Sequence, residues 1–387
     1  MKTVLLPATI VALCLSAWSA SAQTLSGGTR PGPFDAAQES RAQGVVQVKG
    51  TVPLQVKGAP ASKRFVLRYP ETGWNQSLVI GAHGGSGGNN FDPAGKVIGT
   101  DETALDDVIG RHAVGRGFAY ASVDRDGAMT ADEGLALTSQ FANLVSFEIA
   151  RRLKRVPARR YLLGLSMGGG IARAAAEAPG SPYAGIVIVA GANGDLPTGV
   201  ARQKALAEAW PGIDPKAHPG LPDTDPKVVA FAEVIGTPVA ARRLWPYTAT
   251  SAARAAANPA PPGASGNSSG VLRVPVIEVA GTWDDFVIKE LGAYAARVRP
   301  REQHRLYLVE GVWHMSGDDD GTQSFMYIAS RMGLDPDVAK AMSEGPSYIP
   351  TVREAFDRLV AWVERGVTPP PSQTVAPGER LRETTPR

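Results

Sequence analysis

One serine, flanked by glycines, joins an apolar run to an alanine-rich run, and this junction limits the possible folds more than any other stretch. The apolar run is Tyr161–Leu165, and the helix-forming run continues through Ile171–Ala178. Ser166 lies between them, in Gly164-Leu-Ser-Met-Gly168. A strand, sharp turn and helix need glycine at both flanking positions, because side chains there would collide with the neighbouring strand and helix. The turn would hold the hydroxyl beside a helix N-terminus, so we interpret Ser166 as a nucleophile.

A second serine has the same glycine spacing, in Gly84-Gly-Ser-Gly-Gly88. The chain contains 43 glycines, so chance matches to this spacing are expected. Ser86 is followed by Asn89, Asn90 and Pro93, which are typical of a loop and not of a helix. Only Ser166 has a predicted strand before it and a predicted helix after it.

Strand-like and helix-like segments alternate over most of the chain, which predicts an α/β fold with a mostly parallel sheet and helices on both faces. The expected strands and helices, in chain order, are 64–69, 78–82, 101–115 (helix), 118–123, 133–155 (helix), 161–165, 171–178 (helix), 184–190, 273–280, 304–309 and 352–364 (helix). Functional loops are expected where the strands end.

The segment before this alternation contains a short internal repeat. Val46-Gln-Val-Lys-Gly50 and Leu54-Gln-Val-Lys-Gly58 both alternate apolar and polar residues, which predicts a β-hairpin at the edge of the sheet. Residues 23–43 are rich in Gly, Pro, Ser and Gln and are predicted to be a flexible lead-in. The core is predicted to span residues 44–190 and 271–366, followed by a flexible tail over 367–387.

The first 22 residues have the features of a signal peptide. Lys2 precedes an apolar run from Val4 to Leu15, and Ala20-Ser-Ala22 is a small-residue cleavage site. The one cysteine, Cys14, lies inside this segment. The mature chain would then contain no cysteine, which excludes disulfides, a cysteine nucleophile and thiolate metal sites. We expect an exported protein, periplasmic or secreted.

The charge balance gives no case for nucleic acid or a membrane surface as a partner. The formal net charge is +3, with 40 basic and 37 acidic residues. The basic cluster near Arg151 and Arg152 is interpreted as a solvated helix end rather than a binding patch.

Residues 191–270 interrupt the alternation of strands and helices. Prolines and glycines recur there, although Gly199–Ala209 and Val228–Ile235 could form short helices. We interpret this insertion as a cap over the active site, and the alternative is a long surface excursion.

A serine nucleophile needs a base and a carboxylate, and both are predicted near strand ends. Among five histidines, His314 follows the last predicted strand and is the candidate base. Asp284 lies in the turn after the strand around Val276, and it is the candidate acid, with Asp285 as the alternative. Glu278 lies within that strand and is discounted.

Backbone N–H groups are predicted to form an oxyanion hole. The glycine-rich loop after Leu78–Ala82 brings Gly84 or Gly85 close to a substrate oxygen, and Met167 provides the second N–H. His83 is expected to shape this loop, and it is also a candidate substrate-binding residue.

With these residues in place, the chain resembles the α/β-hydrolase superfamily over about residues 60–366, apart from the insertion. Gly164–Gly168 is similar to its nucleophile elbow, His83-Gly-Gly85 to its oxyanion loop, and Gly281–Val287 to its acid turn. His314 stands where the family histidine does. Leu78–Asn90 also resembles exported polyhydroxybutyrate depolymerases and feruloyl esterases, and the ending from Leu359 resembles tannase-like esterases. The cysteines that often tie the tannase-like cap are missing.

Other candidate ligands are less specific. Asp124-Arg-Asp-Gly127 and Asp318–Asp320 lack the spacing of a calcium loop, so no metal or other cofactor is expected. Trp283 and Trp313 flank the acid and the base, where they either fill the core or provide a stacking surface for an aryl or sugar group.

The sequence therefore predicts an exported serine hydrolase that cleaves small or oligomeric carboxylic esters, with aryl, phenolic or polyester-type groups. The alternatives are a serine peptidase or amidase with the same triad and a non-catalytic binding protein of this fold. The sequence does not indicate an oligomeric state.

Overall fold

A computed structural model describes residues 32–34, 36–84, 89–91, 97–125, 129–191, 205, 221–245, 268–284, 287–314 and 345–383. The described residues form a ten-stranded sheet in the order β1-β2-β3-β7-β4-β8-β9-β10-β11-β12. Its strands are β1 (Gln38–Ala42), β2 (Val45–Val56), β3 (Ala59–Pro70), β7 (Ala119–Val123), β4 (Ser77–Ala82), β8 (Arg159–Leu165), β9 (Gly185–Val189), β10 (Val276–Gly281), β11 (His304–Val309) and β12 (Gln373–Val375). A separate hairpin pairs β5 (Asn89–Phe91) with β6 (Val97–Thr100).

The predicted fold class is confirmed. The strands from β7 to β12 run parallel, whereas β1, β2 and β3 form an antiparallel edge that joins the sheet through β3 and β7. The central strands β4, β7 and β9 are buried along their whole length, which explains their continuous apolar runs.

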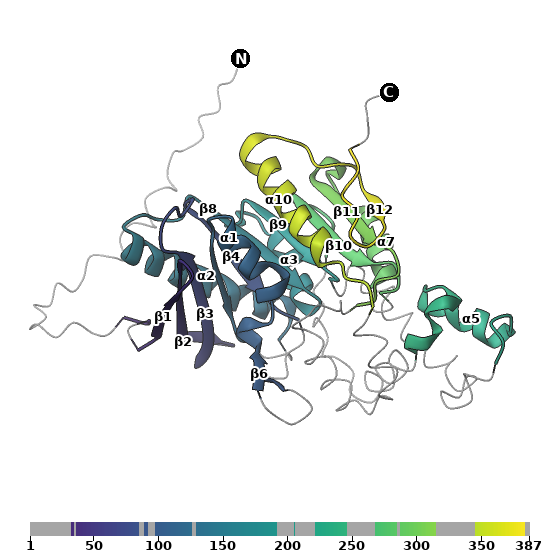
Figure 1. The fold of residues 1–387 in the computed structure, drawn as a ribbon, viewed down its shortest axis with the longest axis horizontal. Coiled ribbons are helices and arrows are strands. Elements are labelled where there is room, and N and C mark those ends of the chain that lie inside the picture. The colour runs from purple at the N-terminus through teal and green to yellow at the C-terminus, as the bar shows by residue number, and fades with distance from the viewer. Residues whose placement is uncertain are drawn as a thin grey trace, which may run out of the picture.

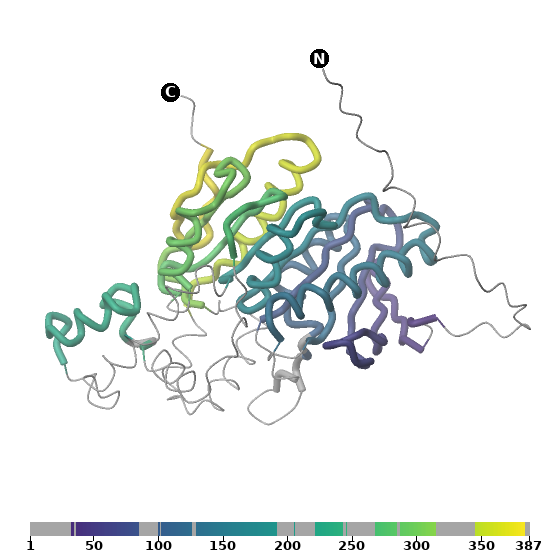
Figure 2. Tube along the Cα trace, turned by 180° about the vertical axis from the view of Figure 1, so that it is seen from behind, coloured from purple at the N-terminus to yellow at the C-terminus, as the bar shows by residue number. Residues whose placement is uncertain are grey.

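Helices cover both faces of the sheet (Figures 1 and 2). On one face, α2 (Ala131–Leu153), α3 (Met167–Glu177) and α7 (Ile288–Arg297) share a core with the sheet. On the other face, α1 (Arg111–Gly115) and α10 (Ile349–Arg365) close a second core. Short helices η1 (Asp101–Thr103), η2 (Asp106–Gly110) and η6 (Arg301–Gln303) complete the connections.

The predicted hairpin within residues 46–58 is wrong. The repeat lies in the single strand β2 up to Val56, and β2 pairs with β3 along its whole length. The turns lie at Gln43-Gly44, before the repeat, and at Lys57-Gly58, its last two residues, where both residues of each pair have positive φ. Two consecutive residues with positive φ form the hairpin turn that fits the twist of antiparallel strands. The interior glycine, Gly50, is accommodated within the strand.

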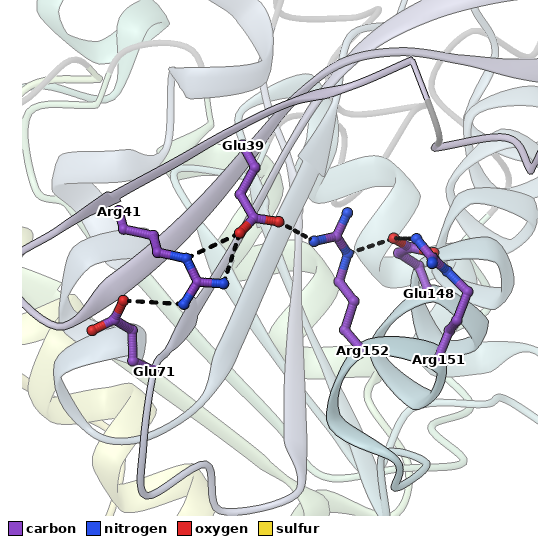
Figure 3. A network of polar contacts seen from close by, with 6 residues as sticks. All are labelled: Glu39, Arg41, Glu71, Glu148, Arg151 and Arg152. Atoms are coloured by element: carbon purple, nitrogen blue, oxygen red, sulfur yellow. Dashed lines mark hydrogen bonds and ion pairs between the residues drawn. The ribbon is translucent and has the colours of Figure 1, made fainter.

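The lead-in predicted as flexible over residues 23–43 contains an edge strand. β1 pairs with β2, and Phe34 packs edge-on against Phe65 at 4.9 Å between ring centroids. Glu39 on β1 accepts hydrogen bonds from Arg41 and from Arg152 near the end of α2 (Figure 3). Arg152 and Arg151 also contact Glu148, so the helix end predicted as solvated carries an ion-pair network, in which Arg151 remains exposed. The predicted signal peptide, residues 1–22, lies outside the described residues.

The C-terminal tail is predicted as flexible over residues 367–387, but its described part, residues 367–383, belongs to the fold. β12 adds to the sheet beside β11, and Pro369 and Pro370 are buried. The carbonyl of Pro370 accepts a hydrogen bond from the Tyr307 hydroxyl at 2.7 Å. Leu381 is 3% exposed and belongs to the core beneath α10. The tail therefore completes one edge of the sheet.

The insertion leaves the core after β9 and returns before β10. The helix predicted at 228–235 is confirmed as α5 (Pro226–Ile235), which packs with η5 (Val239–Leu244) around Trp245. α5 lies beside the α7 end of the sheet (Figure 1), where Lys289 contacts the carbonyl of Glu233. Apart from residue 205, the helix considered at 199–209 lies outside the described residues, as does most of the predicted cap.

Candidate functional site

Ser166 lies in a strained turn between β8 and α3. Its φ is 53° and its ψ is −118°, a conformation that non-glycine residues rarely adopt. A Cβ at Gly164 would overlap the carbonyl oxygen of Gly168, and a Cβ at Gly168 would overlap the carbonyl oxygen of Ala82. The two glycines therefore allow the tight packing that was predicted, and the Ser166 side chain remains half-buried at the C-terminal end of β8.

Three of the predicted residues meet in one hydrogen-bonded chain. Ser166 Oγ lies 2.8 Å from His314 Nε2. His314 Nδ1 lies 3.0 Å from Asp284 Oδ1 and 3.1 Å from Asp284 Oδ2. Asp284 is 0% exposed, so its carboxylate faces the imidazole in a dry environment. A proton on Nδ1 would be held by this carboxylate, which leaves the Nε2 lone pair for the serine hydroxyl.

The sheet brings Asp284 and His314 together because they follow neighbouring parallel strands. β10 and β11 end in register, with Gly281 opposite Val309. Beyond the strands, the Trp283 N–H donates to the Val312 carbonyl at 3.0 Å, and the Gly311 N–H donates to Thr282 Oγ1 at 3.0 Å. The two turns therefore form one unit that fixes the separation of acid and base.

Tyr348, which the sequence analysis did not predict, contacts the backbone of His314. The Tyr348 hydroxyl donates to the His314 carbonyl at 3.0 Å, and Tyr348 is 3% exposed at the start of α10. Trp313 is also buried, and its ring is edge-on to the His314 ring at 6.1 Å between centroids. Trp283 is half-buried. No motif marks Tyr348 in the sequence, because its role depends on where α10 docks.

The predicted oxyanion loop stands directly beside the serine. A Cβ at Gly84 would lie 3.1 Å from Ser166 Cβ and 3.7 Å from Ser166 Oγ. Met167 is the first residue of α3, where a backbone N–H has no acceptor within its own helix. Gly84 and Met167 therefore both lie next to the nucleophile, whereas Gly85 and Ser86 lie outside the described residues.

His83, predicted to bind substrate, is 1% exposed and is bonded within the loop. Its Nε2 accepts from the Arg125 backbone N–H at 3.2 Å, and its Nδ1 contacts the Gly84 carbonyl at 3.0 Å. Burial and then the nearby Arg125 charge lower the pKa of His83 to about 3. The ring is therefore neutral near pH 7, and its hydrogen bonds connect the loop after β4 to the segment after β7.

Two other histidines lie away from the serine. His112 Nε2 is 3.0 Å from Asp357 Oδ1 on α10, and the buried His304 Nε2 is 3.6 Å from Glu278 Oε1. His218, Asp285 and Asp318–Asp320 lie outside the described residues, and Asp124 pairs with Arg64 at 3.5 Å. In the part of the chain that the structure describes, no group of three or more His, Cys, Asp or Glu residues could hold a metal ion. Within those same ranges, no helix has the length and apolar character needed to cross a membrane.

Comparison with protein families finds one model, described as an alpha/beta hydrolase domain, that matches residues 234–382. This stretch contains β10, the acid turn, β11, His314 and α10. A search of curated protein sequences finds no match.

Solved structures with a similar arrangement include several esterases. A cold-adapted esterase from an Arctic intertidal metagenomic library is 13% identical, with 76% of this chain and 95% of that chain covered and a TM-score of 0.37. The Pyrococcus furiosus esterase Pf2001 is 14% identical, with 67% and 81% covered and a TM-score of 0.39. An S-formylglutathione hydrolase from Agrobacterium tumefaciens is 11% identical, with 82% and 98% covered and a TM-score of 0.41. These similarities are too distant to assign a substrate.

Proposed function

We propose that the protein is a serine hydrolase of the α/β-hydrolase kind that cleaves carboxylic esters through an acyl-enzyme. The observation that carries the proposal is the hydrogen-bonded chain from Ser166 Oγ through His314 to the buried Asp284. A serine hydroxyl becomes a useful nucleophile only when a base in this position takes its proton.

In the first half-reaction, Ser166 Oγ attacks the acyl carbon while His314 Nε2 accepts the hydroxyl proton. Asp284 keeps the other proton on Nδ1 and stabilises the imidazolium that forms. The carbonyl oxygen becomes an oxyanion, which receives hydrogen bonds from the N–H groups of Met167 and Gly84, with Gly85 as the alternative donor from the loop. The tetrahedral intermediate collapses when His314 delivers its proton to the leaving alcohol.

In the second half-reaction, water takes the place of the alcohol. His314 accepts a proton from the water as its oxygen attacks the acyl-enzyme, and the oxyanion forms at the same place. Collapse of this second intermediate returns the proton to Ser166 Oγ and releases the carboxylic acid. Neither half-reaction requires a redox group or a metal.

The substrate class follows from residues around the site and remains part of the proposal. Trp283 is half-buried directly before the acid, where it could stack on an aryl or phenolic group. Aryl esters and polyester-type oligomers are therefore the first substrates to test, with matched amides to examine the peptidase or amidase alternative. A cap formed by the insertion would set the acyl and alcohol preferences.

We also propose export, because Lys2, the apolar run to Leu15 and Ala20-Ser-Ala22 have the order of a signal peptide. N-terminal sequencing of protein recovered from periplasm and medium tests this. A mature chain that begins near Gln23 is expected, and an intact Met1 on protein from the cytosol would contradict export.

Labelling with a fluorophosphonate probe, followed by peptide mass spectrometry, tests the mechanism. We expect an adduct on Ser166 that disappears in the His314→Ala variant. His112→Ala is the matched control, since His112 also contacts an aspartate but lies outside the site. An adduct on Ser86, or no adduct on folded protein, would contradict the proposal and favour a non-catalytic binding protein.

A further inference from the structure

Arg125 is buried against the loop that contains the predicted oxyanion donor Gly84. It follows β7, whose last residue is Val123, and β7 lies next to β4, the strand that leads into His83 and Gly84. Arg125 is only 2% exposed. Burying a guanidinium costs desolvation free energy, and hydrogen bonds to buried acceptors offset this cost.

The carbonyls of His83 and Gly84, two consecutive residues of the loop, both bind this guanidinium. Arg125 Nη2 donates to the His83 carbonyl at 2.6 Å and to the Gly84 carbonyl at 2.7 Å. The His83 ring contacts the same Gly84 carbonyl through Nδ1 at 3.0 Å, while its Nε2 accepts from the Arg125 backbone N–H. Arg125 and His83 therefore fix two consecutive carbonyl groups of one loop.

This arrangement determines the direction of the Gly84 N–H. A trans peptide is planar, with its C=O and N–H on opposite sides, so a His83 carbonyl bound by Arg125 directs the Gly84 N–H away from Arg125. The backbone of Gly84 stands against Ser166, as the 3.7 Å separation between its Cβ position and Ser166 Oγ indicates. If this peptide flipped, a carbonyl dipole would be free to face the developing oxyanion and would repel it.

The charge on Arg125 adds a second effect. A charged donor polarises the carbonyl that it binds, and hydrogen bonds along a chain strengthen one another in a medium of low dielectric constant. The N–H on the same peptide then becomes a better donor to negative charge. Both hydrogen bonds come from the single nitrogen Nη2, so a lysine ammonium, which has three N–H donors, should replace part of this contact.

We propose that Arg125 is a positioning residue that presets the oxyanion loop by binding the carbonyls of His83 and Gly84. This proposal rests on the proposed serine hydrolase function. It predicts that Arg125 acts on the transition state and leaves binding of the uncharged ester largely unchanged, because only the tetrahedral state carries an oxyanion.

The test compares Arg125→Met and Arg125→Lys with the wild-type enzyme on an aryl ester. Removing one oxyanion-hole donor in other enzymes lowers kcat by about 10²- to 10³-fold, so we expect a loss approaching 10²-fold for Arg125→Met and a smaller loss for Arg125→Lys. KM should change by less than about threefold. The affinity for an alkyl trifluoromethyl ketone, which forms a tetrahedral oxyanion adduct, should fall in parallel with kcat.

Arg68→Met is the matched control. Arg68 is a partly buried arginine on β3, with its side chain 14% exposed, and it contacts Asp106 and Gln47. We expect it to lower the unfolding midpoint in urea while kcat per labelled active site stays at the wild-type value. This comparison separates general destabilisation from an effect on the oxyanion loop.

The outcomes distinguish this proposal from the proposed function. If wild-type protein is not labelled on Ser166, the hydrolase function fails, and the role of Arg125 fails with it. If wild-type is labelled and both Arg125 variants keep kcat and ketone affinity, only the positioning role is overturned. If Arg125→Met does not fold, the same measurements on Arg125→Lys test the proposal. A fall in kcat that is matched by an equal fall in KM would also overturn the proposal.

Discussion

The guanidinium of Arg173 and the carboxylate of Glu278 form a fully buried ion pair between the helix that begins after Ser166 and the strand that leads to Asp284. Arg173 Nε and Nη2 donate to the two Glu278 oxygens at 3.2 and 3.0 Å. The side chains are 0% and 2% exposed. Arg173 also donates to the carbonyl of Gly191, where the insertion leaves the core, at 3.2 Å. One side chain thus connects the nucleophile helix, the acid strand and the start of the insertion.

Breaking this pair should cost much more stability than breaking a surface pair. Arg173→Met leaves a buried carboxylate without its main counter-charge, and we expect a loss of about 3–5 kcal/mol in the free energy of unfolding in urea. Glu39→Gln removes a partly exposed carboxylate from its arginines and should cost about 1 kcal/mol or less. Equal losses for the two variants would contradict the buried pair as a determinant of stability.

The acid sensitivity of the fold should depend on His83. Burial lowers its pKa from the unfolded value of 6.5 to about 3, so the unfolded chain binds more protons between these values. Stability from the neutral ring is therefore complete above pH 6.5 and decreases as pH falls towards 3. Between pH 6.5 and 5 this single group should remove about 2 kcal/mol.

His83→Gln tests this linkage, because glutamine keeps a donor and an acceptor but does not titrate. Urea unfolding at pH 7 and pH 5 should show a smaller decrease for the variant than for the wild-type protein. His112→Gln is the control, since His112 is a partly buried histidine of α1 that packs against α10 on the other face of the sheet. The same pH dependence in wild-type and His83→Gln would show that His83 is not the group responsible.

Replacing Asp284 by asparagine should inactivate the site with little effect on the fold. The amide N–H₂ can face His314 Nδ1, which favours the tautomer with its proton on Nε2, and Nε2 then cannot accept from Ser166. We expect kcat for ester hydrolysis to fall by about 10⁴-fold. Asp357→Asn is the matched control, because Asp357 contacts His112 at 3.0 Å outside the site. A similar kcat for both variants would exclude the orienting role of Asp284.

The nucleophile turn should tolerate no side chain at Gly168. An alanine there would overlap the carbonyl oxygens of Ala82 and His83, which belong to the strand and loop of the predicted oxyanion hole. Gly168→Ala should therefore destabilise the protein and abolish fluorophosphonate labelling. Gly115→Ala, in α1 with nothing within 4 Å of its Cβ position, should instead stabilise by up to about 1 kcal/mol. Thermal unfolding and labelling of both variants measure this contrast.

The sequence predicted the parallel part of the sheet well because its signals are local. Buried strands such as β4 and β9 are continuous apolar runs, and helices such as α2 and α10 repeat their apolar residues at helical spacing. Boundaries moved where capping decided them: α2 begins at Ala131 because Thr130 and Glu133 form a capping box. The helix α7 was not predicted, although it shares the core with α2 and α3.

The prediction failed for the outermost strand on each side of the sheet: β12 pairs with the distant β11, whereas β1 pairs with the adjacent β2 across a two-residue turn. β1 and β12 are short and partly polar, so nothing in their composition separates them from a flexible segment. The Val46–Gly58 repeat has the alternation of strands but does not say where the chain turns. The positive φ pairs at Gln43-Gly44 and Lys57-Gly58 decided that register.

By itself, the sequence determined the strand, turn and helix around Ser166, since steric limits at Gly164 and Gly168 act over a few residues. It also located Asp284 and His314 after two strands. Only the tertiary structure decided that these strands are neighbours that end in register, which brings the three side chains within hydrogen-bonding distance. Only the fold revealed Arg125, Tyr348 and the Arg173–Glu278 pair, because each acts on a backbone or a charge that comes from a distant segment. Local steric limits depend on adjacent residues and can be predicted from them, whereas contacts between distant segments form only when the sheet assembles.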